Sequence, residues 1–149
     1  MDLVSNRKAH YDFHILDTFE AGIVLTGTEV KSIKAHEASL QDSYVIIKEN
    51  ELFLINCSIS PYKEGNIYNH EERRERKLLM HAYEILKLKK LTQEKGQTLV
   101  PLAFYLSKGK IKLKFALAEG KKSYDKREKI KEREEKKNIQ KILKKDLST

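Results

Sequence analysis

Two histidines and two glutamates are the residues whose type and spacing first suggest chemistry. His10 and His14 lie four apart, so on a strand both side chains would face the same side. A zinc site needs at least three protein ligands, and the sequence offers no third ligand for this pair. Glu29 and Glu37 could form a carboxylate pair, although surface glutamates at this spacing are common. We therefore expect no metal site and a surface or binding role for the histidines.

Cys57 is the only cysteine, which excludes a disulfide within the chain and a multi-cysteine metal site. No helix start or cationic neighbour in the sequence would activate its thiol, so a small buried hydrophobic side chain is favoured over a nucleophile. A Walker phosphate loop, a GxGxxG motif and a serine nucleophile elbow are also lacking. We predict a binding protein without catalytic residues or cofactor, in a reducing, cytoplasmic compartment.

Positive charge is concentrated at the C-terminal end of the sequence. The 149 residues include 30 Lys and Arg against 22 Asp and Glu, a net charge of +8. Residues 120–149 contain 12 of these basic and 6 of these acidic side chains, and so carry +6. A basic segment on a nearly neutral body is typical of an interaction tail, with nucleic acid favoured over an anionic membrane. Residues 1–8 lack the apolar stretch of a signal peptide, and the longest apolar run, 99–106, is too short to span a bilayer, so we expect no membrane association.

Basic and aromatic side chains in the body favour RNA as the polyanion. Lys110, Lys112 and Lys114 alternate with apolar residues, which predicts a row of charges along one strand face. Tyrosines in polar stretches could stack on bases, although each ring or charge could equally serve local packing or a solvated face. The other basic clusters and candidate rings are Arg7, Lys8, Arg73, Arg74, Arg76, Lys77, Tyr62, Tyr68 and Tyr124.

Hydrophobic periodicity predicts the elements that position these side chains. We expect strand material over 11–25 with a break at Ala21-Gly22, and a helix that starts at Gly27-Thr28 with Thr28 as its N-cap. The other expected elements are a hairpin of 44–47 and 52–55, a helix over 82–95 stopped by Gly96, and strands at 99–106, with an edge or bulge at Pro101, and at 111–117.

This order of elements predicts a mainly β fold: a small oligonucleotide-binding-like antiparallel β-barrel with two or three helices. We expect residues 1–119 to form an RNA-binding body and residues 120–149 a basic tail. The tail has few apolar residues and many i,i+4 charge pairs. It should therefore be disordered alone and become helical against a partner.

Motifs in order along nearly the whole chain resemble the SmpB family, the tmRNA-binding or SsrA-binding proteins. The most specific is Gly27-Thr28-Glu29-Val30-Lys31-Ser32. The other matching segments are 6–9, 19–22, 42–45, 59–61, 76–79, 120–122 and 125–128. Several ordered motifs at compatible spacings are far more specific than any one of them.

The resemblance implies a function in ribosome rescue. Members of this family bind the tRNA-like domain of tmRNA and deliver it, as alanyl-tmRNA with elongation factor Tu, to the A site of a stalled ribosome. The tail then occupies the empty mRNA channel at the decoding site of the small subunit, where it becomes helical, and trans-translation tags the nascent chain. The resemblance also implies a cytoplasmic monomer.

In the body, the resemblance implies RNA-binding roles for Glu29, Lys31, Leu79, His81, Lys112, Arg7 and Lys8. A carboxylate repels phosphate, so Glu29 would contact a base edge or a 2′-hydroxyl, and the alternative is a charge in the first turn of a helix. On the first interpretation, Glu29→Ala should weaken RNA binding and leave folding intact. Leu79 could abut a base or belong to the core. His81 stands where the family uses Asn or His.

In the tail, the residues that match the decoding-region segments are Lys121, Lys122, Tyr124, Asp125, Lys126, Arg127, Ile142 and Leu143. Tyr124 stands where some relatives carry a His, and its ring can stack on ribosomal RNA but cannot carry charge. Two alternatives are a ribosomal or ribosome-assembly RNA-binding protein, which shares the basic extension, and an RNA-modifying enzyme. The first does not predict the two motifs together, and the second needs a site that the sequence does not show.

Overall fold

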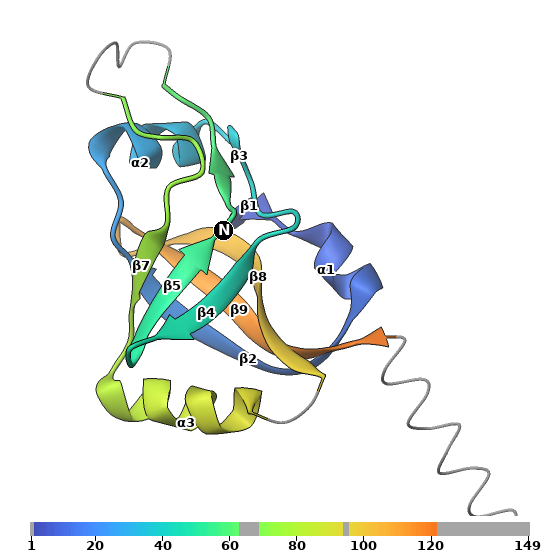
Figure 1. The fold of residues 1–149 in the computed structure, drawn as a ribbon. Helices are drawn as coiled ribbons and strands as arrows, with labels where there is room; N and C mark the ends of the chain where they lie inside the picture. Colours follow the sequence, from blue (N-terminus) through green and yellow to red (C-terminus); the bar gives the residue numbers. More distant parts are fainter. Residues whose placement is uncertain (1, 63–68, 94–95, 122–149) are drawn as a thin grey trace, which may run out of the picture.

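The computed structural model describes residues 2–62, 69–93 and 96–121. The chain runs through nine strands and three helices in this part (Figure 1). They are β1 (Asp2–Ser5), α1 (Arg7–Asp12), β2 (Phe13–Ile23), α2 (Gly27–Lys34), β3 (Ala38–Ser39), β4 (Tyr44–Lys48), β5 (Glu51–Ile55), β6 (Ser58–Ile59), β7 (Arg76–Leu79), α3 (Ala82–Thr92), β8 (Gln97–Ser107) and β9 (Lys110–Gly120).

Six of the strands form a near-closed antiparallel ring. Its order is β8-β4-β5-β7-β2-β9, and β9 pairs back onto β8, while β1 adds to the outer side of β8. The shortest strand pairing in the ring joins β4 and β8, where Val45–Leu99 is the single register pair. β3 and β6 form a separate two-stranded sheet. The prediction of a mainly β, barrel-like fold with two or three helices is confirmed.

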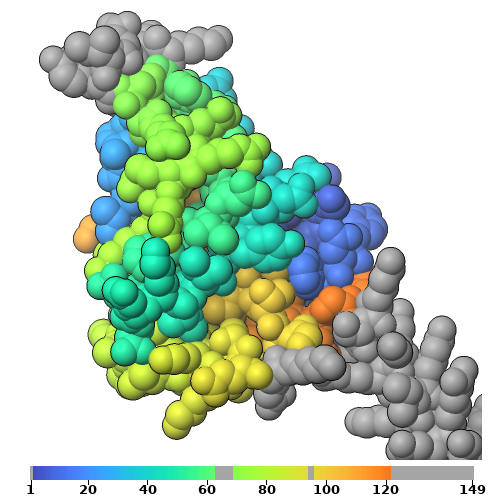
Figure 2. Space-filling view, in the orientation of Figure 1, coloured from blue at the N-terminus to red at the C-terminus, as the bar shows by residue number. Residues whose placement is uncertain are grey.

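Alternation along β9 explains how the ring is filled. Ile111, Leu113, Phe115 and Leu117 point inward and are buried. Lys110 and Lys114, on the other face, are exposed, because successive strand residues face opposite sides. The helices add buried side chains to the same core: Ile33 from α2, and Ile85 and Leu88 from α3. α2 and α3 lie at opposite ends of the ring (Figure 1). In the space-filling view, the paired strands β4 and β5 adjoin one another on the visible face (Figure 2).

The structure corrects three local predictions. Residues 11–12 end helix α1 instead of starting a strand, so His10 is helical, His14 is on β2, and the two do not share a strand face. β2 continues through Ala21-Gly22 without a break, because its neighbour β9 pairs along this length. The N-cap of α2 is Thr26, not Thr28: its hydroxyl accepts from the Glu29 N–H, and the Glu29 carboxylate accepts from the Thr26 N–H.

Other predictions hold. The hairpin is formed by β4 and β5, and the register of β8 shifts between Pro101 and Ala103, which confirms a bulge at the proline. Helix α3 ends at Thr92, a turn earlier than expected, and Gly96 has a positive φ of 85° after it. Among the described helices, none is long and apolar enough to cross a bilayer. The predicted tail beyond Lys121 lies outside the described residues.

Candidate nucleic-acid interface

A row of directly paired residues crosses four strands of the ring. Gly22 on β2 lies opposite Lys112 on β9 and opposite Leu79 on β7, and Lys112 lies opposite Tyr105 on β8. Paired residues project to the same face of a sheet. The row therefore places an exposed apolar side chain and a lysine on either side of a residue with no side chain.

Gly22 forms the floor of a groove because it lacks a side chain. The groove encloses about 310 Å³ and is lined by Gly22, Ile23, Leu25, Val30, Leu79, Gly109, Lys110, Ile111 and Lys112. A Cβ at Gly22 would lie 3.3 Å from the Cβ of Leu79, closer than ordinary packing allows. Leu79 is 52% exposed, which contradicts the core interpretation of this residue and leaves its side chain at the groove. An apolar floor beside two lysines suits a base together with its phosphate.

His81 stands at a second hollow that shares Leu79 with the groove. This hollow encloses about 380 Å³ and is lined by Glu20, Leu79, Met80, His81 and Glu84. His81 is the N-cap of α3, and its main-chain carbonyl accepts from the N–H groups of Glu84 and Ile85. Its ring makes no capping hydrogen bond and is exposed. Three of the predicted RNA-binding residues, Leu79, His81 and Lys112, therefore converge on one stretch of surface.

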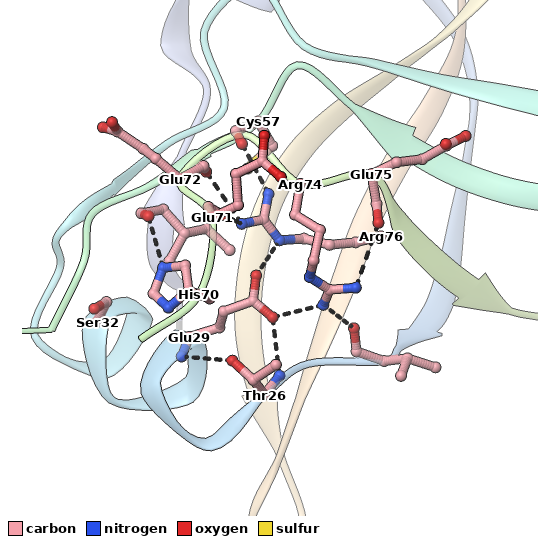
Figure 3. Close-up of polar contacts among 12 residues, drawn as sticks. Thr26, Glu29, Ser32, Cys57, His70, Glu71, Glu72, Arg74, Glu75 and Arg76 are labelled. Atoms are coloured by element: carbon pink, nitrogen blue, oxygen red, sulfur yellow. Dashed lines mark hydrogen bonds and ion pairs between the residues drawn. The ribbon is translucent and has the colours of Figure 1, made fainter. Parts of the chain in front are cut away.

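Glu29 is not exposed on this surface. Its side chain is fully buried between two arginines that follow it by 45 and 47 residues (Figure 3). Arg74 donates to one carboxylate oxygen at 2.6 Å, and the Nε of Arg76 donates to the other at 2.5 Å. The Thr26 N–H also donates to the first oxygen, at 2.9 Å. Both oxygens have protein partners, so the structure gives the carboxylate a different environment from the RNA contact expected from the sequence.

Opposing effects act on the pKa of Glu29. Burial by itself raises the pKa, but hydrogen bonds from Arg74, from the backbone at Thr26 and from Arg76, with the charge of Arg76, outweigh burial, so the pKa is lowered. Arg76 is itself fully buried, and its remaining guanidinium N–H groups donate to the carbonyls of Cys57, Glu71 and Glu72. The predicted basic patch is therefore partly internal, because Arg76 is in the core and Arg74 only half-buried beside it.

The buried network holds the segment that walls the groove. Arg74 donates to the Val24 carbonyl as well as to Glu29, and the Val24 N–H donates to the Lys77 carbonyl. These two bonds at Val24 join segment 24–30 to segment 74–77. Leu25 and Val30, which belong to segment 24–30, line the groove. The network therefore holds a wall of the groove in place without lining the groove itself.

The other predicted body residues lie apart from the groove. The Nζ of Lys31 sits 5.3 Å from the centre of the Tyr62 ring, on the outer side of α2. Lys8 on α1 pairs with Asp42 at 3.6 Å, and both side chains are about half exposed or more. Arg7 lines a different hollow with His10 and Lys114, and that hollow shares no residue with the groove. RNA contacts by Arg7, Lys8 and Lys31 stay predictions.

Cys57 is buried as expected. Burial raises the pKa of its thiol to about 12, so it stays protonated and is no nucleophile. Among the described residues, no group of three potential ligands could hold a metal ion. The predicted tail residues from Lys122 to Leu143 lie outside the described ranges, and Tyr68 does as well.

Sequence reasoning missed Gly22 and Tyr83, which lie at or beside this surface, and the internal positions of Arg74 and Arg76. Gly22 was interpreted as a strand break, and only its cross-strand partners show that it opens a groove. Arg74 and Arg76 were assigned to the surface because charge usually lies there. Tyr83, 71% exposed at the start of α3, lies inside the range predicted as a helix and belongs to none of the predicted RNA-binding residues. Its position two residues after His81 was the available signal.

Comparison with known proteins shows a family match over most of the chain. The family model described as "SmpB protein" matches residues 3–145. An SsrA-binding protein of Protochlamydia amoebophila is 59% identical over 143 residues, which cover 96% of this chain and 94% of that protein. The SsrA-binding protein of Chlamydia pneumoniae is 51% identical, with 96% and 95% covered. That of Acidothermus cellulolyticus is 53% identical, with 95% and 89% covered.

A solved structure shares the fold. It is described as "tmRNA-SmpB: a journey to the center of the bacterial ribosome". The similarity has a TM-score of 0.67 and 43% sequence identity, and covers 78% of this chain and 82% of the solved one.

Proposed function

This chain belongs to the SmpB family of SsrA-binding proteins, and we infer from that membership that it binds SsrA RNA (tmRNA) and acts in ribosome rescue by trans-translation. It is a non-enzymatic RNA-binding protein, with tmRNA and the ribosome as its partners. The observation that carries this assignment is the match over residues 3–145, since it covers both the body and most of the tail.

We propose that the tRNA-like domain of tmRNA meets the surface formed by Gly22, Leu79, His81 and Lys112. Lys112 supplies charge for a phosphate, and Leu79 supplies an exposed apolar surface for a base. Glu29 serves this surface from inside the fold, by holding Arg74 and segment 24–30. Arg7, Lys8 and Lys31 contribute a further, more diffuse attraction to the RNA.

The tail, residues 120–149, is proposed to act on the ribosome and not on the tRNA-like domain. Its charge suits ribosomal RNA along the mRNA channel. Residues 124–127 would meet the decoding site, with Tyr124 stacked on a base, while Ile142 and Leu143 support a helix further along. The same proposal has the chain arrive as a cytoplasmic monomer with elongation factor Tu and alanyl-tmRNA.

The test is the identity of the RNA that the protein holds in cells. The full chain is purified under native conditions and its bound RNA is sequenced. We expect one dominant structured RNA, tmRNA. Enrichment of ribosomal RNA without tmRNA would instead support the alternative, a ribosomal or ribosome-assembly protein.

A further inference from the structure

Two aromatic rings lie exposed against each other at the hollow that shares Leu79 with the groove. The rings of His81 and Tyr83 are stacked, with centroids 5.6 Å apart and planes 11° from parallel. Tyr83 is 71% exposed and His81 is exposed as well. The pairing arises because His81 is the extended N-cap residue of α3 (ψ 143°), whereas Tyr83 is already in the helix. An exposed pair of this kind keeps apolar ring surface in contact with water instead of packing it into the core.

We propose that Tyr83, supported by His81, is a stacking platform for an unpaired RNA base. Nearly parallel rings already hold one another in place, so little side-chain freedom is lost when a base stacks on the open face of Tyr83. Tyr83 is thus a further RNA-binding residue, and this assignment rests on the proposed function.

The surroundings of the pair select a base over a phosphate. The charged residues that line the adjoining hollow are Glu20 and Glu84, and no lysine or arginine of residues 2–62, 69–93 and 96–121 lines it. Carboxylates repel a phosphate but accept hydrogen bonds from the amino groups of a base edge. Leu79 lines both this hollow and the groove that holds Lys112. A strand whose phosphate lies at Lys112 therefore has a continuous apolar path over Leu79 to the aromatic pair.

The test compares variants of the full chain for binding to a transcript of the tRNA-like domain of tmRNA. Tyr83→Ala and Tyr83→Leu both remove the flat ring, and the second keeps apolar bulk. Each should weaken binding roughly 5- to 150-fold, the equivalent of ~1–3 kcal/mol for one base stack. Tyr83→Phe, which keeps the ring, should bind like the unchanged protein. Leu86→Ala is the matched control, since Leu86 is 50% exposed on the same helix.

Salt dependence separates stacking from charge. Tyr83→Ala should leave the slope of log affinity against log salt unchanged, whereas Lys112→Ala should reduce its magnitude by about 0.7–0.9. Binding by Tyr83→Ala and Tyr83→Leu at the unchanged level would overturn the platform, and so would an equal loss in Leu86→Ala. If the unchanged protein fails to prefer tmRNA over a tRNA of similar size, the proposed function itself fails, which is a different result.

Discussion

Replacing Glu29, whose carboxylate is buried, should lower the stability of the folded protein. The sequence alone predicts instead that this replacement leaves folding intact. Glu29→Ala deletes three hydrogen bonds at once: from Arg76 at 2.5 Å, from Arg74 at 2.6 Å and from the Thr26 N–H at 2.9 Å. It also leaves the fully buried guanidinium of Arg76 without its counter-ion. The carbonyls of Cys57, Glu71 and Glu72 accept hydrogen bonds from Arg76 but do not balance its charge.

The expected loss in free energy of unfolding follows from the burial of the Glu29–Arg76 ion pair. Loss of one partner from a buried ion pair costs about 3–5 kcal/mol. Loss of a helix cap alone costs only ~0.5–2 kcal/mol. For a domain of this size, the larger figure lowers the melting temperature by on the order of 10–20 °C. It is also a large fraction of the roughly 5–15 kcal/mol that holds a typical domain folded.

The assay is urea and thermal unfolding of the full chain, followed by circular dichroism. Glu37→Ala is the matched control, because Glu37 follows the same helix but is exposed, and it should unfold like the unchanged protein. Replacing Glu29 and its fully buried partner together, in Glu29→Leu with Arg76→Met, should cost less than Glu29→Ala, since no fully buried charge remains. If Glu29→Ala loses less than about 1 kcal/mol, the network contributes nothing special to folding and the reasoning is refuted.

Three further predictions follow from the same structure. Gly22→Val should fill the floor of the groove and weaken tmRNA binding in a gel-shift assay, with Thr18→Val on the same strand as a control; unchanged affinity would remove the groove from the interface. Because the pKa of Glu29 is lowered in the folded state, its contribution to stability is present above the unfolded pKa and is lost as pH falls through the folded one, so acid unfolding should be shallower in Glu29→Gln. Truncation after Gly120 should preserve tmRNA binding and abolish peptide tagging on stalled ribosomes; tagging by the truncated chain would contradict a role of the tail at the decoding site.

Local pattern was sufficient wherever a feature depends on neighbours in sequence. Alternation from Lys110 to Leu117 predicted which residues of β9 fill the ring, because the two-residue period of a strand sorts side chains between its faces. The hairpin of β4 and β5 and the bulge at Pro101 were predictable for the same reason. Ordered motifs also identified the family, since residues 27–32 and 125–128 occur together.

Only the tertiary structure decided which side chains of these elements are exposed and which are buried. Glu29 lies in a motif typical of RNA binding, yet its carboxylate points inward, because arginines 45 and 47 residues later fold back against it. Such a pairing leaves no trace in local periodicity, and charge alone suggests the surface for all three residues. Gly22 likewise has meaning only beside Leu79 and Lys112, which come from two other strands. Sequence thus determined the fold class and the family, whereas long-range packing decided which residues line the groove and which hold its wall from within.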